Sequence, residues 1–327
     1  MRDFSYFRAA STEEAIRATL DAGAMLLAGG TTLLDLAKCG VTEPDTLVDI
    51  THLAGLGDIT VDANGATIGA LAKMGEVADH PGVKAAFPAV AQSLSLAASA
   101  QLRNMATIGG NLLQRTRCSY FREPGVFPAC NKRNPGSGCS AIGGVTRNHA
   151  VLGTSRACIA VNPGDLAVAL VAFDAYVEMG RRRVAIEDFY MLPGETPDWE
   201  TVLKKGEIIT GIAIPASAAA KNSTYLKVRD RQSYEFAAAS AAVGIEFEAD
   251  GKTVRDIRVA LGGVATRPWR ARAVEQSLIG TVLNVEAVEK ASRLSMEGAV
   301  SHGGNRYKIE LAPRVVARAI LTMGGLA

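Results

Sequence analysis

Four cysteines in one irregular segment limit what this chain can fold into. Cys118, Cys130, Cys139 and Cys158 follow one another with the spacing C-x11-C-x8-C-x18-C, in a stretch rich in Gly, Pro, Arg and Asn. A long segment without regular structure is usually functional or disordered. The spacing is wider than the C-x2-C pairs of zinc fingers and ferredoxins, so the residues alone leave zinc and an iron–sulfur cluster both open. Four free or paired thiols in a flexible loop are the alternative.

Basic side chains surround the first two cysteines, where they would offset the negative charge of thiolates. A solvated loop face and a docking patch for a partner are the other interpretations. His149 lies in the same segment and is expected to be a surface residue rather than a ligand. The fifth cysteine, Cys39, ends a helical pattern and is expected to be a small buried hydrophobe. The basic residues are Arg115, Arg117, Arg122, Lys132 and Arg133.

Two glycine pairs with neighbouring hydroxyl side chains predict turns that bind a phosphate group. They are Ala28-Gly29-Gly30-Thr31-Thr32 and Thr107-Ile108-Gly109-Gly110-Asn111. Backbone N–H groups at such turns bind a pyrophosphate well because no Cβ blocks the approach. Gly-Gly occurs at four further places, so ordinary tight turns are the alternative. Neither stretch is G-x-G-x-x-G, and a Rossmann nucleotide site is therefore not supported.

Composition and length indicate an ordinary folded protein of two or three domains. Hydrophobic residues make up 48% and charged residues 21% of 327 residues. The net charge of +2 argues against a dominant nucleic-acid or membrane-surface function. No apolar run reaches the roughly 20 residues that span a bilayer, and the N-terminus lacks the apolar core of a signal peptide. We expect a cytoplasmic protein, unless a partner that carries a signal exports it.

The hydrophobic pattern predicts an α/β beginning and an antiparallel end. A small α/β unit comes first, followed by a hairpin at Asn64-Gly65 and, at 215–223, a candidate linker of small and polar residues. The expected strands are 4–8, 24–28, 47–50, 59–61, 66–68, 175–179, 183–186, 207–215, 225–229, 242–247 and 254–262. The expected helices are 15–22, 33–38, 73–79, 88–102, 270–278, 285–298 and 307–323.

The order of three motifs resembles the flavin-binding subunit of the molybdenum hydroxylases, the xanthine dehydrogenase family. These motifs are Ala28-Gly29-Gly30-Thr31-Thr32-Leu33-Leu34, then Arg103-Asn104-x-x-Thr107-Ile108-Gly109-Gly110-Asn111, then Gly164-Asp165-Leu166. The resemblance covers essentially the whole chain. It implies an α+β protein, with the two-part FAD-binding fold of the vanillyl alcohol oxidase and p-cresol methylhydroxylase type. An α+β C-terminal domain of the carbon monoxide dehydrogenase flavoprotein type follows. The implied boundaries are 1–57, 58–218 with a cysteine-rich insert at about 114–160, and 222–327.

The resemblance also implies a set of cofactor-binding residues. Leu26, Leu27, Ala28, Gly29, Gly30, Thr31, Thr32 and Leu33 would contact the FAD pyrophosphate, and Thr107, Ile108, Gly109, Gly110 and Asn111 would form the second nucleotide-binding turn. Asp165 would anchor the cofactor, Ile209 would pack on it and Lys227 would reach the flavin. The cysteine segment resembles the insert that holds a [4Fe-4S] cluster in the flavin subunits of periplasmic aldehyde oxidoreductase and 4-hydroxybenzoyl-CoA reductase. This favours iron–sulfur over zinc for Cys118, Cys130, Cys139 and Cys158.

The function implied is electron transfer, with no catalytic residue in this chain. We expect a heterotrimer, single or doubled, in which a molybdenum-cofactor subunit oxidises an aldehyde and a [2Fe-2S] subunit passes electrons on. FAD here would deliver them to an external electron acceptor. Neither nucleic-acid binding nor membrane insertion is expected. Two rivals remain: a stand-alone FAD oxidoreductase, and a zinc-bearing structural subunit without flavin.

Overall fold

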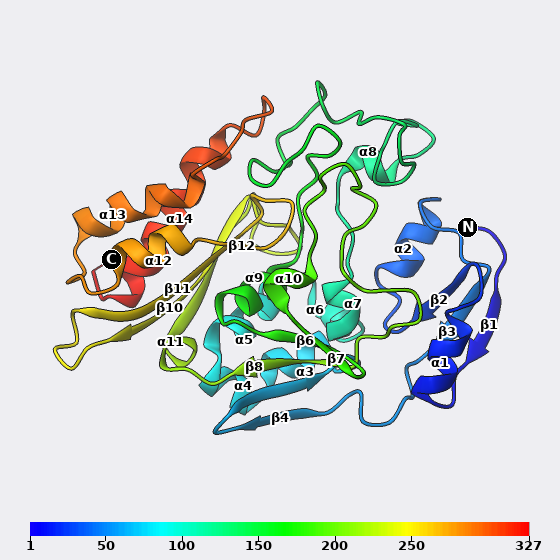
Figure 1. Ribbon diagram of the computed structural model, residues 1–327, viewed down its shortest axis with the longest axis horizontal. Helices are drawn as coiled ribbons and strands as arrows, with labels where there is room; N and C mark the ends of the chain where they lie inside the picture. The colour runs from blue at the N-terminus through cyan, green and yellow to red at the C-terminus, as the bar shows by residue number, and fades with distance from the viewer. Residues whose placement is uncertain (327) are drawn as a thin grey trace.

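Three β-sheets, built from successive parts of the chain, organise the molecule in the computed structural model, which describes residues 1–326 (Figure 1). The first sheet is parallel, in the order β1-β3-β2. Ser11 caps its first helix, where the hydroxyl accepts a hydrogen bond from the Glu14 N–H at 3.2 Å. The elements of this part are β1 (Ser5–Arg8), α1 (Thr12–Ala18), β2 (Ala24–Leu27), α2 (Leu33–Lys38) and β3 (Thr46–Asp49).

The second sheet is antiparallel and has the order β4-β5-β8-β6-β7. The Asn64-Gly65 hairpin joins its first two strands, which confirms that prediction. Two segments far apart in the sequence therefore meet, because β8 lies between β5 and β6. The elements are β4 (Ile59–Asp62), β5 (Gly65–Gly69), α3 (Met74–Asp79), α4 (Pro81–Ala86), α5 (Pro88–Ser95), α6 (Ala100–Arg103), α7 (Ile108–Leu112), α8 (Ser119–Arg122), α9 (Asp165–Ala172), β6 (Tyr176–Met179), β7 (Arg182–Ala185), α10 (Ile186–Phe189) and β8 (Gly211–Pro215).

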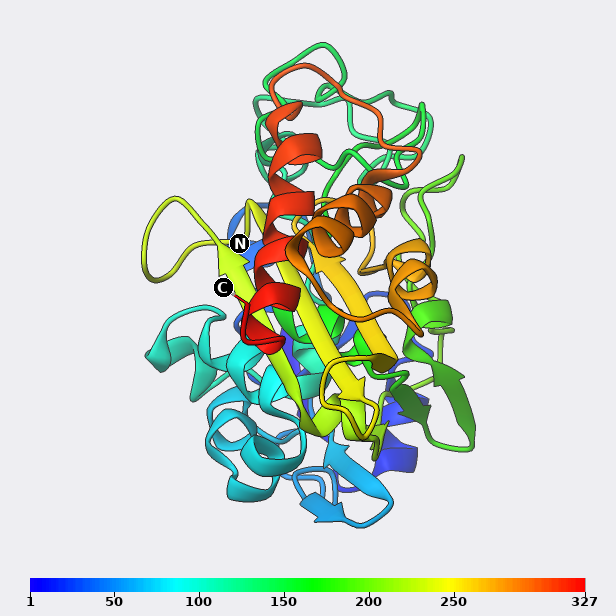
Figure 2. The same ribbon diagram turned by 90° about the vertical axis from the view of Figure 1, so that its left-hand side faces the viewer.

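The third sheet is antiparallel in the order β12-β11-β10-β9, and three helices cover its outer face (Figure 2). The longest of them, α14, lies along the strands and packs on β10 and β9. The elements are α11 (Ala218–Lys221), β9 (Ser223–Val228), β10 (Ala239–Phe247), β11 (Val254–Gly262), β12 (Trp269–Arg270), α12 (Arg272–Leu278), α13 (Val285–Arg293), the 3-10 turn η1 (Leu294–Met296) and α14 (Tyr307–Met323).

Helix α9 joins the second and third sheets, because every one of its residues is buried. It packs on α5 and on the inner face of β10 and β11. Successive side chains of β10 pack in different hydrophobic cores. Ala241 and Val243 face the C-terminal helices, while Ala242 faces the core that contains α9. The apolar run after Asp165 is therefore a helix that is hydrophobic all round, as expected for a buried one.

Two expectations about local structure are wrong. Residues 88–102 are not one helix: α5 ends at Ser95, Ala98 has a φ of 49°, and α6 begins after Ser99. Residues 108–112 form helix α7 instead of a glycine turn. In both cases tertiary packing decides the conformation. The candidate linker 215–223 contains the short helix α11, in which Ala219 and Ala220 are buried.

The cysteine segment runs from α7 to α9 and contains one regular element, the short helix α8. It forms the group of long loops at the top of Figure 1, above α2 and beside the C-terminal helices. No helix of residues 1–326 combines the length and the hydropathy needed to cross a membrane.

Candidate cofactor site

A pocket of about 220 Å³ lies where the three parts of the chain meet. Its walls come from the start of α2, from α6 and α7, from the beginning of α9, and from the loop between β9 and β10. Six of the predicted cofactor residues line it: Thr31, Thr32, Gly110, Asn111, Asp165 and Lys227.

The first glycine pair brings two parts of the chain into close contact. A Cβ on Gly29 would lie 2.1 Å from the Met105 carbonyl oxygen, so only glycine fits against this backbone. Gly30 has a φ of 70°, in the left-handed region, and completes the turn into α2. Among residues 1–326, none accepts a hydrogen bond from the backbone N–H groups of residues 29–32. This turn therefore offers free donors beside the pocket.

The second glycine pair forms the start of a helix. Thr107 caps α7, and its Oγ1 accepts a hydrogen bond from the Gly110 N–H at 3.3 Å. The Gly109 N–H donates to the Ala70 carbonyl at 2.8 Å, and a Cβ on Gly109 would lie 3.1 Å from the Ala70 Cβ. The Asn111 side chain lines the pocket, and its Oδ1 is buried without a hydrogen-bond partner among the described residues.

Asp165 and Lys227 form a buried ion pair at the pocket wall. Lys227 Nζ lies 2.7 Å from Asp165 Oδ2 and 3.1 Å from the Leu96 carbonyl oxygen. The Tyr225 hydroxyl donates to Asp165 Oδ1 at 2.7 Å. Burial raises the pKa of the Asp165 carboxyl, and the Lys227 ammonium opposes this. Both side chains are thus held by protein groups, although both border the pocket.

The other predicted contacts do not line this pocket. Ile209 is 4% exposed and belongs to the central hydrophobic core, ahead of β8. The predicted residues outside the pocket lining are Leu26, Leu27, Ala28, Gly29, Gly30, Leu33, Thr107, Ile108, Gly109 and Ile209.

The sequence analysis missed the loop between β9 and β10. Arg231, Tyr234, Glu235 and Phe236 all line the pocket, and Tyr234 has a φ of 54°. One feature of the sequence could have indicated this loop: about twelve residues, two of them aromatic, separate the expected strands 225–229 and 242–247. Loops on a rigid scaffold often carry functional residues.

Arg117 was predicted as part of a basic cluster, and it connects this pocket with the cysteine segment. Its guanidinium lies 5.2 Å from the centre of the Phe236 ring, and its Nη1 lies 2.9 Å from Asp35 Oδ2. Nε of Arg117 is buried and has no partner within residues 1–326. The side chain lines both the pocket and a neighbouring cavity of about 210 Å³ that contains Cys118 and His149.

All five cysteines are free, and the four of the segment gather in its interior. Cys130 and Cys139 face each other across an isolated β-bridge. Cys118 packs in two small hydrophobic clusters, one of which contains Cys130 and the other Cys139. Burial, with smaller contributions from neighbouring Cys130 and Cys158, raises the pKa of the Cys118 thiol to about 12, although hydrogen bonds from backbone N–H groups oppose this rise. No three His, Cys, Asp or Glu side chains of the described chain are arranged around one metal-ion position.

His149 is not the surface residue that we expected. It is 4% exposed, and its Nε2 lies 3.2 Å from Cys118 Sγ. Burial lowers the pKa of His149 to about 4, with a further contribution from Lys308, so the imidazole is neutral. Cys39 is only partly buried, and its Sγ accepts a hydrogen bond from Arg122 at 3.6 Å.

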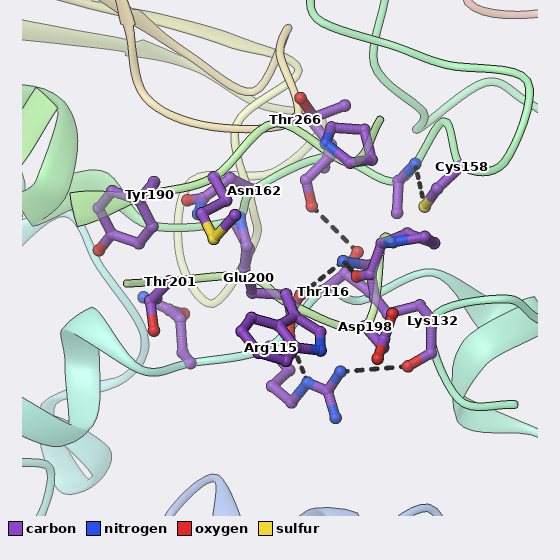
Figure 3. Close-up of a pocket in the computed structure, with 18 of the residues that line it drawn as sticks. Arg115, Thr116, Lys132, Cys158, Asn162, Tyr190, Asp198, Glu200, Thr201 and Thr266 are labelled. Atoms are coloured by element: carbon purple, nitrogen blue, oxygen red, sulfur yellow. Dashed lines mark hydrogen bonds and ion pairs between the residues drawn. The ribbon is translucent and has the colours of Figure 1, made fainter. Parts of the chain in front are cut away.

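The basic side chains of the predicted cluster bind other groups of the protein instead of forming a solvated face. Arg133 donates to four backbone carbonyl groups of the segment, and Arg122 joins Arg117 on Asp35. Arg115 and Lys132 both bind Glu200 in a cavity of about 260 Å³, shown in Figure 3. Cys158 forms part of the same cavity wall. These pairs fasten the segment to the rest of the chain.

Comparison with known proteins identifies both halves of the chain. Residues 2–217 match the family described as the FAD binding domain in molybdopterin dehydrogenase, and residues 224–323 match the CO dehydrogenase flavoprotein C-terminal domain. The fold class predicted from the sequence is thereby confirmed.

Two curated relatives and one solved structure match over most of their length. The aldehyde oxidoreductase FAD-binding subunit PaoB of Escherichia coli K12 is 42% identical, over 98% of each chain. The glyceraldehyde dehydrogenase medium chain of Sulfolobus acidocaldarius is 30% identical, over 90% of this chain and 88% of the relative. A carbon monoxide dehydrogenase from Hydrogenophaga pseudoflava, solved without the Mo-pyranopterin moiety of its cofactor, superimposes with a TM-score of 0.75 at 26% identity, over 100% and 99% of the two chains.

Proposed function

This chain belongs to the FAD-binding subunits of the molybdenum hydroxylases, and from that membership we propose that it transfers electrons inside an aldehyde-oxidising complex. It is the flavoprotein subunit, and substrate catalysis takes place in a partner subunit. The proposal adds three finer points. The chain binds FAD and a [4Fe-4S] cluster, receives electrons from a [2Fe-2S] subunit, and delivers them to an external acceptor in a heterotrimer with a molybdenum subunit.

The residues around the pocket fit FAD. The free N–H groups of residues 29–32 are suited to a pyrophosphate, because glycine leaves their approach open. Asn111 Oδ1 is a buried acceptor that lacks a donor within residues 1–326, and a ligand N–H or O–H would satisfy it. The free donors of this turn beside the pocket are the observation that carries the flavin assignment.

FAD bound here would supply two-electron redox chemistry. The backbone N–H groups of residues 29–32 would bind the phosphates of FAD. The side chains of Thr32 and Asn111 would bind other polar atoms of the cofactor. Tyr234 and Phe236 of the β9–β10 loop would cover the pocket and limit the access of water. Lys227 and Asp165 would border the cofactor as an ion pair without net charge.

The donor set of the cysteine segment fits an iron–sulfur cluster. Four free thiols of one segment lie near one another, and thiolates are the usual ligands of such clusters. A multi-iron cluster distributes its ligands around a larger body than a single metal ion does.

Two neighbouring walls support an electron path between the sites. Gln114 and Pro163 line both the flavin pocket and the cavity at Cys158. Arg117 lines the flavin pocket and immediately precedes Cys118 in the sequence. The cysteine segment and the flavin pocket therefore share side chains instead of being separated by a layer of core. The names of the two relatives favour aldehydes as the substrate of the complex.

The test is the cofactor content of this chain, purified without air and free of its partner subunits. Absorption spectra, with iron, sulfide, zinc and released flavin measured on one sample, should give about four irons per FAD. Cys118→Ser should lose most of the iron and keep FAD. Cys39→Ser is the matched control, because Cys39 lies outside the segment, and it should keep both.

Other results would support the rival functions. Flavin with zinc and no iron would contradict the cluster and leave the flavin site standing. A protein without flavin would contradict the electron-transfer function. Full turnover of an aldehyde by the isolated subunit would show a stand-alone oxidoreductase.

A further inference from the structure

His149 is fixed against the cysteine cluster by its surroundings. Its carbonyl oxygen and that of Ala150 accept hydrogen bonds from the fully buried Asn305 amide at 3.5 and 2.8 Å, and its ring lies 5.9 Å from the Tyr120 ring. Nδ1 is buried and has no partner within residues 1–326. Nε2 is therefore the ring atom that meets a polar neighbour, the Cys118 sulfur at 3.2 Å.

The direction of this hydrogen bond depends on the state of Cys118. A thiol can donate its S–H to Nε2, but a thiolate bound to iron has no proton to give. In a cluster-bound protein the contact can persist only when Nε2 carries the hydrogen and donates it to sulfur. Cluster binding thus selects one imidazole tautomer, with Nδ1 as the unprotonated nitrogen.

His149 differs from the other donors near these sulfurs. Cys158 Sγ accepts a backbone N–H from Ala160 at 3.4 Å. Within residues 1–326, the imidazole is the one side chain in hydrogen-bond contact with any of the four sulfurs of the segment. Hydrogen bonds to sulfur are one of the factors that set the reduction potential of an iron–sulfur cluster.

We propose that His149 is a positioning residue that donates an N–H···S hydrogen bond to Cys118 and thereby raises the reduction potential of the cluster. The inference rests on the proposed function, in which Cys118 is a cluster ligand. Reduction adds negative charge to the cluster and its sulfurs, so a donor at Cys118 stabilises the reduced form more than the oxidised form. Removing the donor lowers the potential and makes the cluster harder to reduce.

The experiment compares three variants in the intact complex purified without air. His149→Leu removes the donor and keeps an apolar side chain. His149→Gln keeps a side-chain N–H that can reach the position of Nε2. His302→Leu is the control, because His302 Nε2 lies 3.1 Å from Thr154 Oγ1 and, within residues 1–326, forms no hydrogen bond to a cysteine. Iron and sulfide per FAD are measured first, and the cluster midpoint potential is then measured by a redox titration followed by EPR.

We expect a more negative cluster potential in His149→Leu, a value near wild type in His149→Gln, and no shift in His302→Leu. Loss of iron from His149→Leu with retention in His149→Gln would also support the hydrogen bond. An unchanged potential in a fully loaded His149→Leu complex would overturn the inference, as would loss of iron from both His149 variants. A wild-type complex that shows no [4Fe-4S] EPR signal, and no iron beyond that of the [2Fe-2S] subunit, would instead overturn the cluster proposal itself.

Discussion

At the scale of single residues, Asp165 and Lys227 form a pair that the sequence did not predict. The resemblance implies that each residue contacts the cofactor. The two side chains also bind each other, and 1% of the Lys227 side chain and 6% of the Asp165 side chain are exposed. The pair links α9 to β9, and Lys227 also binds the carbonyl oxygen of Leu96 just beyond α5. The pair therefore fixes part of the pocket wall.

We predict that Lys227→Met destabilises the protein strongly. The change leaves a buried carboxylate without its cation, which costs about 3–5 kcal/mol in comparable cases. The double variant Asp165→Asn with Lys227→Met should recover much of this loss, because no charge stays buried. Thermal and urea unfolding of wild type and the variants measures the effect. Equal stability of the single and double variants would contradict it.

Asp49 should make the first sheet sensitive to acid. Burial favours the neutral acid, but hydrogen bonds from Tyr6 and Thr51, together with the charge of Arg8, outweigh it and lower the pKa from 3.8 to about 2. A carboxyl whose pKa is lower in the folded state stabilises the fold above its unfolded pKa. This contribution, about 2 kcal/mol, is lost as the pH falls from about 4 to about 2.

The corresponding variant is Asp49→Asn. Its unfolding free energy should lie about 2 kcal/mol below that of wild type at pH 6, and the gap should narrow as the pH falls below 4. Urea unfolding at pH 6, 4 and 3 measures the gap. A gap that stays constant with pH would mean that the Asp49 charge does not stabilise β1 against β3.

At the scale of elements, the turn between β2 and α2 depends on its contact with the connection between α6 and α7. The sequence predicted a strand, a glycine turn and a helix here, and the three follow as expected. The pattern could not show why glycine is needed at position 29. The reason is the Met105 carbonyl oxygen, which approaches from a segment more than seventy positions away in the chain.

Gly29→Ala should weaken FAD binding by about tenfold, because about 1.4 kcal/mol of strain at the turn is enough for that change. The added Cβ must push the turn away from Met105, and the free N–H groups move with it. Gly57→Ala is the matched control, since a Cβ there meets no atom within 4 Å and Gly57 does not have a positive φ. Flavin retained after gel filtration and the FAD dissociation constant are the measurements. Equal retention by both variants would contradict the role of the turn.

At the scale of the whole molecule, Arg117 contacts all three parts of the chain. It binds Asp35 of α2, packs on Phe236 of the β9–β10 loop, and belongs to the cysteine segment itself. Arg122 binds the same Asp35 carboxylate but does not line the flavin pocket. The two arginines therefore separate the effect of anchoring the segment from the effect of bordering the pocket.

We expect Arg117→Gln to lower FAD retention several-fold, because it removes the guanidinium that packs on Phe236 at the pocket wall. Arg122→Gln should loosen the segment and lower iron content while FAD changes little. The FAD and iron contents of the two purified variants, compared with those of wild type, are the measurement. Parallel loss of FAD and iron in both variants would mean that the segment and the pocket fold as one unit.

Much of the molecule follows from the sequence by itself. The periodicity of apolar residues predicted β11 (Val254–Gly262) and α14 (Tyr307–Met323) with their observed bounds. The Asn64-Gly65 pair predicted its hairpin, and the ordered motifs identified the family. These features depend on local conformation and on side-chain patterns, which neighbouring residues determine.

The tertiary structure alone decided how distant residues meet. The sequence could not reveal that α5 ends at Ser95, that Ala219 and Ala220 are buried in α11, or that His149 lies against Cys118. It also gave no partner for Asp165 or Lys227. Each of these outcomes depends on contacts between segments far apart in the chain, and the free energy of burying or pairing a side chain is fixed only when those segments are packed together.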